Sequence, residues 1–372
     1  MSLNALVEVS RYYGNKSDYV LAGGGNTSWK DEETLYVKGS GQSLAEVDAA
    51  SFVKMDRKAL AGIWDKKYPH LETEREREFL SDMMAARKKG EEQKRPSVEA
   101  LLHDIMPFAF VVHLHPALVN GLTCSQRGES AMKEIFDDDA IWIPSINPGY
   151  TLARHVKNSM DAYKEIYNKN VQIVFLQNHG VFTGADNTDV IRELYGEIIT
   201  KIGAMLIKKP DFLDDRQETV VDSNTPRGAI LHALKNLSGA SIFMSNSETF
   251  TFLKDLSSFF PISSAFTPDH IVYAGSKPLF TELQTPDGIQ EAWKGFVQET
   301  GRKPKIIAVQ GIGIFGAAAT EKAAKLALLL FGDAIKIAVY TESFGGPNFM
   351  AADKIDFINN WEAERFRASI ST

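Results

Sequence analysis

The chain has 372 residues, of which 44% are hydrophobic and 24% charged, and its formal net charge at pH 7 is -7. This length exceeds the usual size of one domain, so two domains are expected, and the composition is that of a soluble globular protein. The acidic balance argues against a nucleic-acid partner, although a pocket in an acidic protein can still bind an anionic small molecule.

Cysteine content and apolar runs indicate the compartment. Cys124 is the only cysteine, so no disulfide can form within the chain, which favours a reducing cytoplasm. The first residues lack the basic segment and long apolar core of a secretory signal, and no apolar run reaches membrane-spanning length. We therefore predict a cytoplasmic protein without a membrane partner.

Helical and strand patterns alternate through the first half of the chain. Two glycine-rich turns, at residues 23–28 and 39–41, interrupt this alternation. The patterns predict helices over 3–13, 45–55, 72–89, 96–106, 152–168 and 188–207, and strands over 18–21, 34–38, 109–115, 141–144 and 171–177.

A polar stretch at residues 211–224 precedes a second series of elements that starts at Pro226. We take this stretch as a domain boundary, which gives a first domain over 1–215 and a second over 226–372. In the second domain, helices are predicted over 227–237, 247–257, 288–299 and 320–331, and strands over 241–244, 271–274 and 305–310.

One internal similarity links the two halves. Residues 174–182 (VFLQNHGVF) align with residues 307–315 (IAVQGIGIF), which places Ile312 opposite His179. Two unrelated strand-glycine-helix turns explain the similarity at least as well as a degenerate duplication does. Under both interpretations the second domain has no histidine cluster, so we expect a structural or assembly role for it.

The strongest chemical signal is the pair His113 and His115, which stands at the end of an apolar run. Residues two apart on a strand project to the same side and can bind one ion, although an isolated pair is equally consistent with a structural role. His179 follows a second apolar run, and Glu99 lies upstream. Three imidazoles and a carboxylate indicate a metal site with an open position for a substrate. For Glu99 alone, a favourable interaction with the start of a helix is the simpler explanation.

The glycine-rich turns are typical of anion sites because glycines expose backbone amides. Asn26, Thr27 and Ser28 add donors to the first turn, which lacks the lysine of a nucleotide-binding P-loop and the spacing of a dinucleotide fingerprint. A tight turn alone would explain it better. Together with Ser40, Gly41 and Ser97, however, it could hold one phosphate.

In their order along the chain, these segments resemble the class II aldolase/adducin family. The similar segments are GGGNTS at 23–28, VKGSG at 37–41, PSVE at 96–99, HLHP at 113–116, PG at 148–149 and NHG at 178–180. The resemblance covers roughly residues 1–210 and is closest to the aldolase half of bifunctional rhamnulose-1-phosphate aldolase/short-chain dehydrogenase proteins. No glycine fingerprint combined with a Tyr-x-x-x-Lys pair, as in a dehydrogenase half, follows.

The resemblance implies a fold, a set of site residues and an assembly. The fold would be α/β, with three layers around a mixed, mostly antiparallel central sheet, plus a smaller C-terminal α/β domain; the alternation alone would suggest a parallel sheet. A homotetramer is also implied. The implied metal ligands, usually for zinc (Zn2+), are His113, His115 and His179; the catalytic carboxylate is Glu99; the phosphate-binding positions are Asn26, Thr27, Ser40, Gly41 and Ser97.

The resemblance also implies an activity. A metal-dependent aldolase would cleave a ketose 1-phosphate of the rhamnulose or fuculose type into dihydroxyacetone phosphate and an aldehyde, through a metal-stabilised enediolate. Related epimerases carry aspartate where this chain has Glu99, so glutamate favours an aldolase. The alternatives are a sugar-phosphate epimerase or dehydratase on the same scaffold, and a non-catalytic assembly module like the adducin head.

Overall fold

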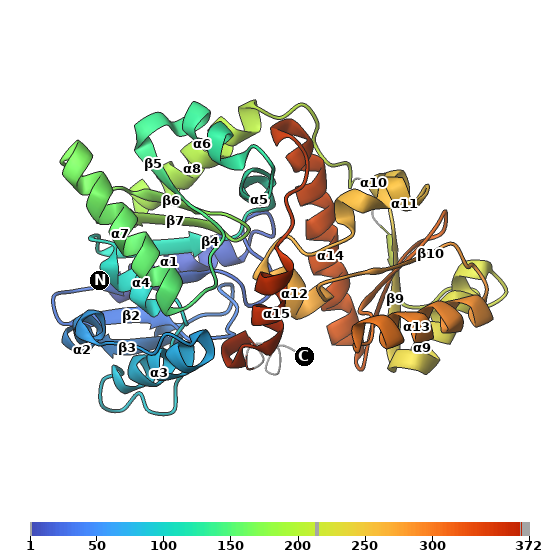
Figure 1. Cartoon of the computed structure of the whole chain (residues 1–372), viewed down its shortest axis with the longest axis horizontal. Coiled ribbons are helices and arrows are strands. Elements are labelled where there is room, and N and C mark those ends of the chain that lie inside the picture. Colours follow the sequence, from blue (N-terminus) through green and yellow to red (C-terminus); the bar gives the residue numbers. More distant parts are fainter. Residues whose placement is uncertain (1, 213–215, 365, 367–372) are drawn as a thin grey trace. The chain divides into compact units, whose positions relative to one another are not determined.

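Figure 1 shows a computed structural model of the chain, which describes residues 2–212, 216–364 and 366. The chain forms two compact units. The first comprises Met1–Thr123 and Gly128–Met205, and the second comprises Cys124–Arg127 and Leu206–Thr372. The positions 213–215, which end the first domain expected from the sequence, and the last residues of the second domain lie outside the described part.

The first unit is built on a mixed sheet of seven strands in the order β3-β2-β1-β4-β7-β6-β5. Only β5 and β6 run parallel, and the other neighbours are antiparallel. This confirms the mostly antiparallel sheet implied by the resemblance. The strands are β1 (Asn26–Lys30), β2 (Thr34–Lys38), β3 (Phe52–Asp56), β4 (Phe110–Leu114), β5 (Ala140–Ile143), β6 (Ile173–Leu176) and β7 (Gly180–Ala185).

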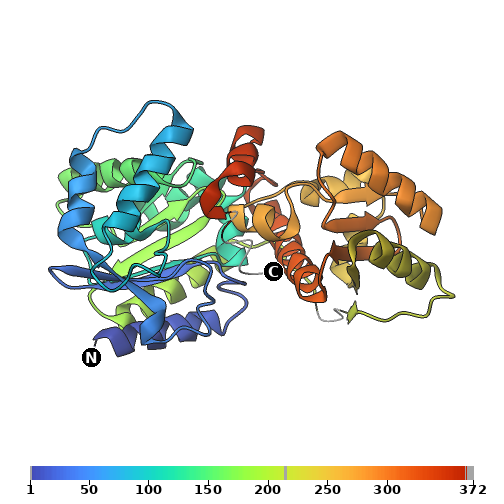
Figure 2. The same cartoon turned by 90° about the horizontal axis from the view of Figure 1, so that it is seen from below.

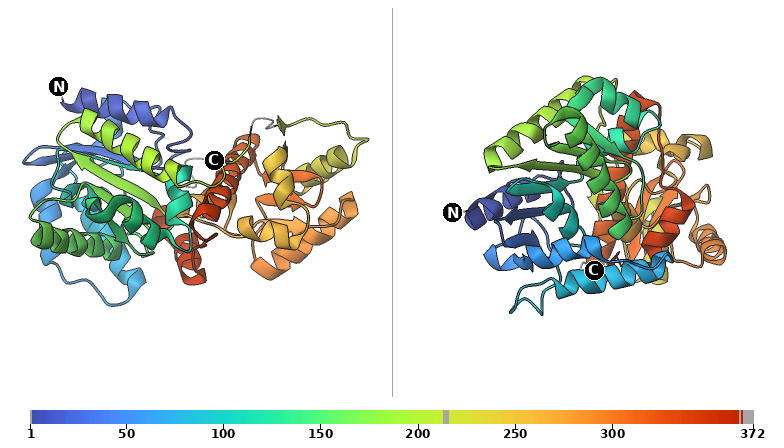
Figure 3. Two further views of the ribbon diagram at one scale, coloured as in Figure 1. Left: turned by 90° about the horizontal axis from the view of Figure 1, so that it is seen from above. Right: turned by 60° about the vertical axis from the view of Figure 1, so that its left-hand side comes forward.

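Helices cover both faces of this sheet and complete three layers. Helices α1 (Ser2–Gly14) and α8 (Thr188–Ala204) lie on one face, with Leu6 and Tyr195 buried against the strands. Figure 2 and the left panel of Figure 3 show these two helices together on one side of the strands. On or beside the rest of the sheet lie α2 (Arg57–Gly62), α3 (Glu72–Ala85), α4 (Ala100–Ile105), α5 (Ala117–Thr123), α6 (Gly128–Phe136) and α7 (Tyr150–Tyr167).

The second unit contains a five-stranded sheet in the order β10-β11-β12-β9-β8. This confirms a smaller C-terminal α/β part. Its strands are β8 (Arg216–Glu218), β9 (Ala240–Ser245), β10 (Leu279–Thr281), β11 (Ile306–Val309) and β12 (Gly313–Ala318). Its helices are α9 (Pro226–Ser238), α10 (Ser247–Phe252), α11 (Leu256–Phe259), α12 (Pro268–Ala274), α13 (Pro286–Thr300), α14 (Glu321–Thr341) and α15 (Ala352–Asn360). No helix in the described part of the chain combines the length and apolar composition needed to cross a membrane.

The two sheets share a strand order and a register. The hairpin of β6 and β7 pairs Ile173 with Thr183, and the hairpin of β11 and β12 pairs Ile306 with Gly316, 133 residues further along the chain for both partners. In each sheet a parallel strand flanks the hairpin on one side, and an antiparallel strand flanks it on the other. The similarity of residues 174–182 to 307–315 therefore extends to five strands in the same order.

Several elements differ from those predicted. The predicted helix at 45–55 is a 3-10 turn, η1 (Ala49–Ser51), followed by β3, because the segment pairs with β2. The predicted strand at 271–274 belongs to α12, in which every residue is buried. An apolar run this short has no period that separates strand from helix. The predicted strand at 18–21 is a turn, and β1, β7, β8, β10 and β12 were not predicted.

Candidate metal centre and active site

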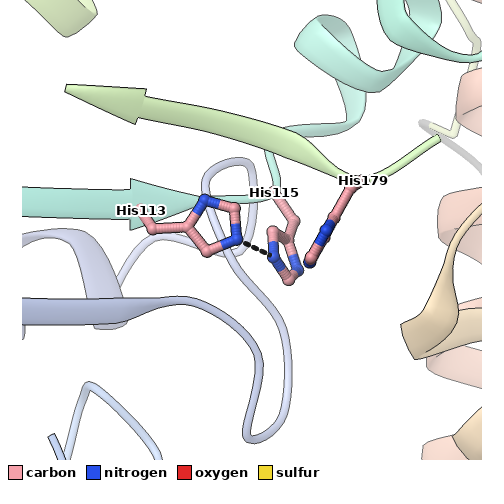
Figure 4. A group of neighbouring side chains, drawn as sticks. All are labelled: His113, His115 and His179. Carbon is pink, nitrogen blue, oxygen red and sulfur yellow. Dashed lines mark hydrogen bonds between the residues drawn. The ribbon is translucent and has the colours of Figure 1, made fainter. Parts of the chain in front are cut away.

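Three histidines converge at one edge of the first sheet (Figure 4). His113 lies on β4, His115 follows the end of that strand, and His179 lies in the turn between β6 and β7. One ring nitrogen of each lies within 4.8 Å of those of the other two. The Nε2 atoms of His113 and His115 are 2.8 Å apart. The structure thus brings together the three side chains that the sequence indicates as metal ligands.

The sheet holds His113 in the orientation that a metal ligand requires. Its side chain is fully buried, and its Nδ1 lies 3.1 Å from the carbonyl oxygen of Val181 on β7. Because a carbonyl only accepts, Nδ1 carries the proton and Nε2 keeps its lone pair for the cluster. Phe182 stacks on the imidazole with the ring centroids 4.0 Å apart and the planes 12° from parallel. These contacts prevent rotation of the ring.

The turn between β6 and β7 places His179 beside His113. Asn178 adopts a left-handed conformation with φ of 58°, and the His179 backbone N–H donates to the Leu176 carbonyl at 3.2 Å. Gly180 follows, and a side chain there would collide with the Leu114 carbonyl oxygen, which lies 2.4 Å from an ideal Cβ position. The residue after His179 must therefore be glycine for strands β4 and β7 to approach this closely.

Glu99, the residue immediately before α4, faces the histidine cluster. Its Oε1 lies 3.6 Å from Nε2 of both His113 and His179, and the side chain is 6% exposed. Its Oε2 accepts a hydrogen bond of 2.6 Å from the Asn26 amide. Since Asn26 on β1 is paired directly with His113 on β4, the register of the sheet fixes the position of the carboxylate beside the imidazoles.

The donor set fits a divalent metal. Glu99 Oε1 is buried and accepts no hydrogen bond from the described residues, although an isolated buried carboxylate oxygen is costly. A cation between this oxygen and the imidazole nitrogens would compensate that cost. Three neutral imidazoles with one carboxylate nearby are typical of a zinc site that keeps an exchangeable position.

Of the residues expected to bind phosphate, Thr27 lies apart from the others, which are Asn26, Ser40, Gly41 and Ser97 and lie near Glu99. Asn26 contacts Glu99, and Ser97 lies close in the chain, with its hydroxyl accepting from the Glu99 backbone N–H at 3.2 Å. Ser40 lies next to them, because its N–H donates to the Arg95 carbonyl at 2.9 Å. Gly41 follows with φ of 77°. The Thr27 side chain lies on the opposite face of the sheet, where its hydroxyl contacts Ser10 on α1 at 2.6 Å.

Lys38 is a site residue that the sequence analysis did not single out. It is the last residue of β2 and is 2% exposed, and its ammonium donates to the carbonyls of Gly23 at 3.1 Å and Gln42 at 2.8 Å. Gly23 belongs to the first glycine-rich turn, and Gln42 directly follows the second. A lysine within an apolar strand directly before a glycine was the available signal, since lysine is seldom buried without partners.

His103, Ser28 and Lys30 form a group of polar contacts next to the site. His103 is fully buried, and its Nδ1 contacts the Ser28 hydroxyl at 2.8 Å. Burial, and then the positive charges of Lys30 and Lys38, lower the pKa of His103 to about 3. Burial also lowers the pKa of Lys30 to about 7; its ammonium donates to the His103 carbonyl at 2.5 Å. His103 is therefore a neutral core residue at physiological pH and lies outside the metal cluster.

Comparison with known sequences identifies relatives of the first unit and of the whole chain. The family model of the Class II Aldolase and Adducin N-terminal domain matches residues 4–195, just over half of the chain. An uncharacterized oxidoreductase of Bacillus subtilis (strain 168), YuxG, is 22% identical over 415 residues, which cover 98% of this chain and 58% of that protein. The chain thus spans less than two thirds of the length of that relative.

Solved structures are similar to about half of the chain. The N-terminal class II aldolase domain of a conserved protein from Thermoplasma acidophilum is 26% identical, with a TM-score of 0.46, and the match covers 54% of this chain and 92% of that chain. An L-fuculose 1-phosphate aldolase is 17% identical, with a TM-score of 0.38, and the match covers 54% of this chain and 83% of that chain.

Proposed function

The chain belongs to the class II aldolase and adducin family, and from this premise we propose that it is a metal-dependent aldolase acting on a ketose 1-phosphate of the rhamnulose or fuculose type. The products would be dihydroxyacetone phosphate and an aldehyde. The metal ligands would be His113, His115 and His179, and Glu99 would be the catalytic carboxylate.

The observation that carries this proposal is the position of Glu99 relative to the imidazoles. One oxygen lies 3.6 Å from two of the three ring systems, and the other is held at 2.6 Å by Asn26. A carboxylate held at the edge of a three-histidine cluster can serve as a fourth ligand or as an acid and base. An assembly module has no need of such an arrangement.

A divalent metal at this cluster supplies Lewis-acid stabilisation of the negative charge that develops on the substrate oxygens. In the cleavage direction the hydroxyl at carbon 4 releases its proton to water, the bond between carbons 3 and 4 breaks, and carbon 3 then gains a proton that Glu99 has taken up from water. Glu99 would deliver that proton to carbon 3, and in the reverse reaction it would remove it. Asn26 would keep the carboxylate directed at the reacting carbon.

The phosphate would bind on the segments that adjoin Glu99. We assign this role to Ser40, Gly41 and Ser97, with Asn26 serving both the phosphate and the carboxylate; Thr27 would contribute only its main chain. Backbone amides of a glycine turn and small hydroxyl side chains suit an anion in an acidic protein. Binding energy from a phosphate that does not react can position the scissile bond.

Four further assignments complete the proposal. Zinc is proposed as the metal because of the three imidazoles. A homotetramer and a cytoplasmic location are proposed from the family resemblance and from the single cysteine, Cys124. We further propose that this chain corresponds to the aldolase part of longer relatives such as YuxG, which is named an oxidoreductase.

Product analysis tests the reaction type. The metal-loaded chain would be incubated with a panel of ketose 1-phosphates, and dihydroxyacetone phosphate would be trapped by an NADH-coupled reduction. We expect release of the three-carbon phosphate and an aldehyde from at least one 6-deoxyketose 1-phosphate, and its loss after chelation. An isomeric phosphate as the product would indicate an epimerase, and loss of water without carbon-carbon cleavage would indicate a dehydratase; both results would overturn the proposal.

A further inference from the structure

The Lys38 side chain joins two turns that are separate in the sequence. Its ammonium donates to the carbonyl oxygen of Gly23, in the first glycine-rich turn, and to that of Gln42, directly after the second. The side chain is 2% exposed. A buried ammonium bound by carbonyl oxygens fixes both segments, because releasing either one would leave a charged donor without its acceptor.

The main chain of the same residue reaches the third segment. The Lys38 carbonyl accepts from the backbone N–H of Ser97 at 3.1 Å, and the neighbouring Ser40 N–H donates to the Arg95 carbonyl at 2.9 Å. Gly39 forms a bridge with Pro96 between these contacts. One residue is therefore bonded to all three segments that the sequence suggested could hold one phosphate.

The ammonium also brings a positive charge into this part of the protein. The charge of Lys38 is among the causes, after burial and Lys30, that lower the pKa of the neighbouring His103. A charge that acts on His103 also acts on an anion bound at the turns, since water does not screen a buried charge as it screens an exposed one. This attraction is strongest for a ligand with two negative charges.

We infer that Lys38 is a positioning residue for a phosphate monoester dianion, which holds the three phosphate-binding segments together and makes the site selective for phosphorylated ligands. This inference rests on the proposed function for the identity of the ligand. The role is separate from catalysis, because the Lys38 ammonium donates to the carbonyl oxygens of Gly23 and Gln42, which are not among the metal ligands.

A partly buried lysine of the second unit offers a contrast. Lys305 in the second unit also donates its ammonium to a carbonyl, that of Val272, at 2.7 Å. That contact joins no glycine-rich turns and lies in the other unit. Replacing Lys305 by methionine removes the same charge and the same kind of hydrogen bond, so it provides a matched control for Lys38→Met.

The test measures binding of inorganic phosphate to the full-length, metal-loaded chain by titration calorimetry, for the parent protein and for Lys38→Met, Lys38→Arg and Lys305→Met. We expect Lys38→Met to weaken phosphate binding by roughly 10- to 100-fold, as expected for loss of a charged hydrogen-bonding group. Lys38→Arg should recover part of the affinity, because it restores charge and donors, and Lys305→Met should bind like the parent. The metal content should stay the same in all four.

A kinetic comparison separates positioning from simple loss of structure. With a ketose 1-phosphate that the parent cleaves, Lys38→Met should raise KM more than it lowers kcat. Undiminished phosphate affinity in a folded, metal-loaded Lys38→Met protein would contradict the inference, as would equal loss in Lys38→Met and Lys38→Arg. If phosphate binding depends on Lys38 but no carbon-carbon cleavage occurs, the aldolase proposal fails and this inference stands.

Discussion

Glu99 presents one oxygen to the histidines and the other to Asn26. Replacing the carboxylate by an amide keeps the shape and removes the ability to move a proton. We expect Glu99→Gln to lower kcat by about 10²- to 10⁴-fold, the usual contribution of a general acid or base, with an unchanged metal content. Steady-state kinetics and metal analysis measure the two effects, and Glu248→Gln, a buried glutamate of the second unit, serves as the control. Near-normal turnover would exclude Glu99 from catalysis.

His103 makes a separate prediction about acid stability. Its pKa in the folded protein is about 3, below its ordinary value of 6.5. Between pH 6.5 and 3 the unfolded chain therefore binds a proton that the folded chain does not, so this residue makes stability fall as the pH falls through that window. In His103→Asn this contribution is absent. Thermal unfolding in chelator between pH 7 and 4.5 should show a shallower decline for the variant than for the parent, and parallel declines would disprove the assignment.

Among the elements, the hairpin of β6 and β7 affects the metal ligands most directly, because its backbone lies against His115. A Cβ at Gly180 would lie 2.4 Å from the Leu114 carbonyl oxygen and 2.8 Å from Cδ2 of His115. Gly180→Ala should displace His115 and reduce metal affinity by about tenfold or more, since ligand orientation strongly affects affinity. Competition with a chelator measures it. Gly196→Ala on α8, where no atom lies within 4 Å of the added methyl group, should keep normal affinity.

The same hairpin shows what the sequence could and could not predict. The apolar runs that precede His179 and contain His113 predicted β6 and β4, because both are strong local patterns. The strand β7 begins at Gly180 and contains a second glycine, Gly184, and it was missed because glycines weaken a strand pattern. The helix predicted at 45–55 failed because pairing with β2 outweighed local propensity.

The directions of side chains also could not be predicted from the sequence. Histidine spacing was sufficient to suggest the cluster, but the contact between Asn26 and Glu99 depends on the pairing of β1 with β4, which no local pattern encodes. Thr27 illustrates the opposite outcome. Neighbouring residues on a strand face opposite sides, so Thr27 contacts α1, whereas Asn26 contacts Glu99 on the other side. Lys38 was missed because its partners are backbone carbonyls, which no side-chain pattern in the sequence marks.

At the scale of the whole chain, the two sheets share the same strand order around the same hairpin. Gly311 and Asn178 both adopt a positive φ, of 67° and 58°, at matching places in the two turns. His113 pairs with Phe182, and its counterpart Phe243 pairs with Phe315. We propose that the second unit is a degenerate copy of the core of the first.

This correspondence predicts how many metal ions the chain binds. In the second unit the positions of His113, His115 and His179 are occupied by Phe243, Ser245 and Ile312. An apolar ring and an aliphatic side chain offer no metal ligand. Elemental analysis of the purified full-length chain should therefore give one divalent ion per chain, and His113→Ala should reduce this to a small fraction. Two ions per chain would contradict the prediction.

The proposal that the three histidines hold a catalytic metal ion can be tested directly. The metal-free chain is titrated with zinc, and the rate of dihydroxyacetone phosphate release from a ketose 1-phosphate is measured. If His113, His115 and His179 hold the catalytic ion, the rate should rise linearly, reach a plateau at one equivalent per chain, and stay near zero for His179→Ala over the same titration. Release that is independent of added metal, or a normal plateau in His179→Ala, would contradict the account.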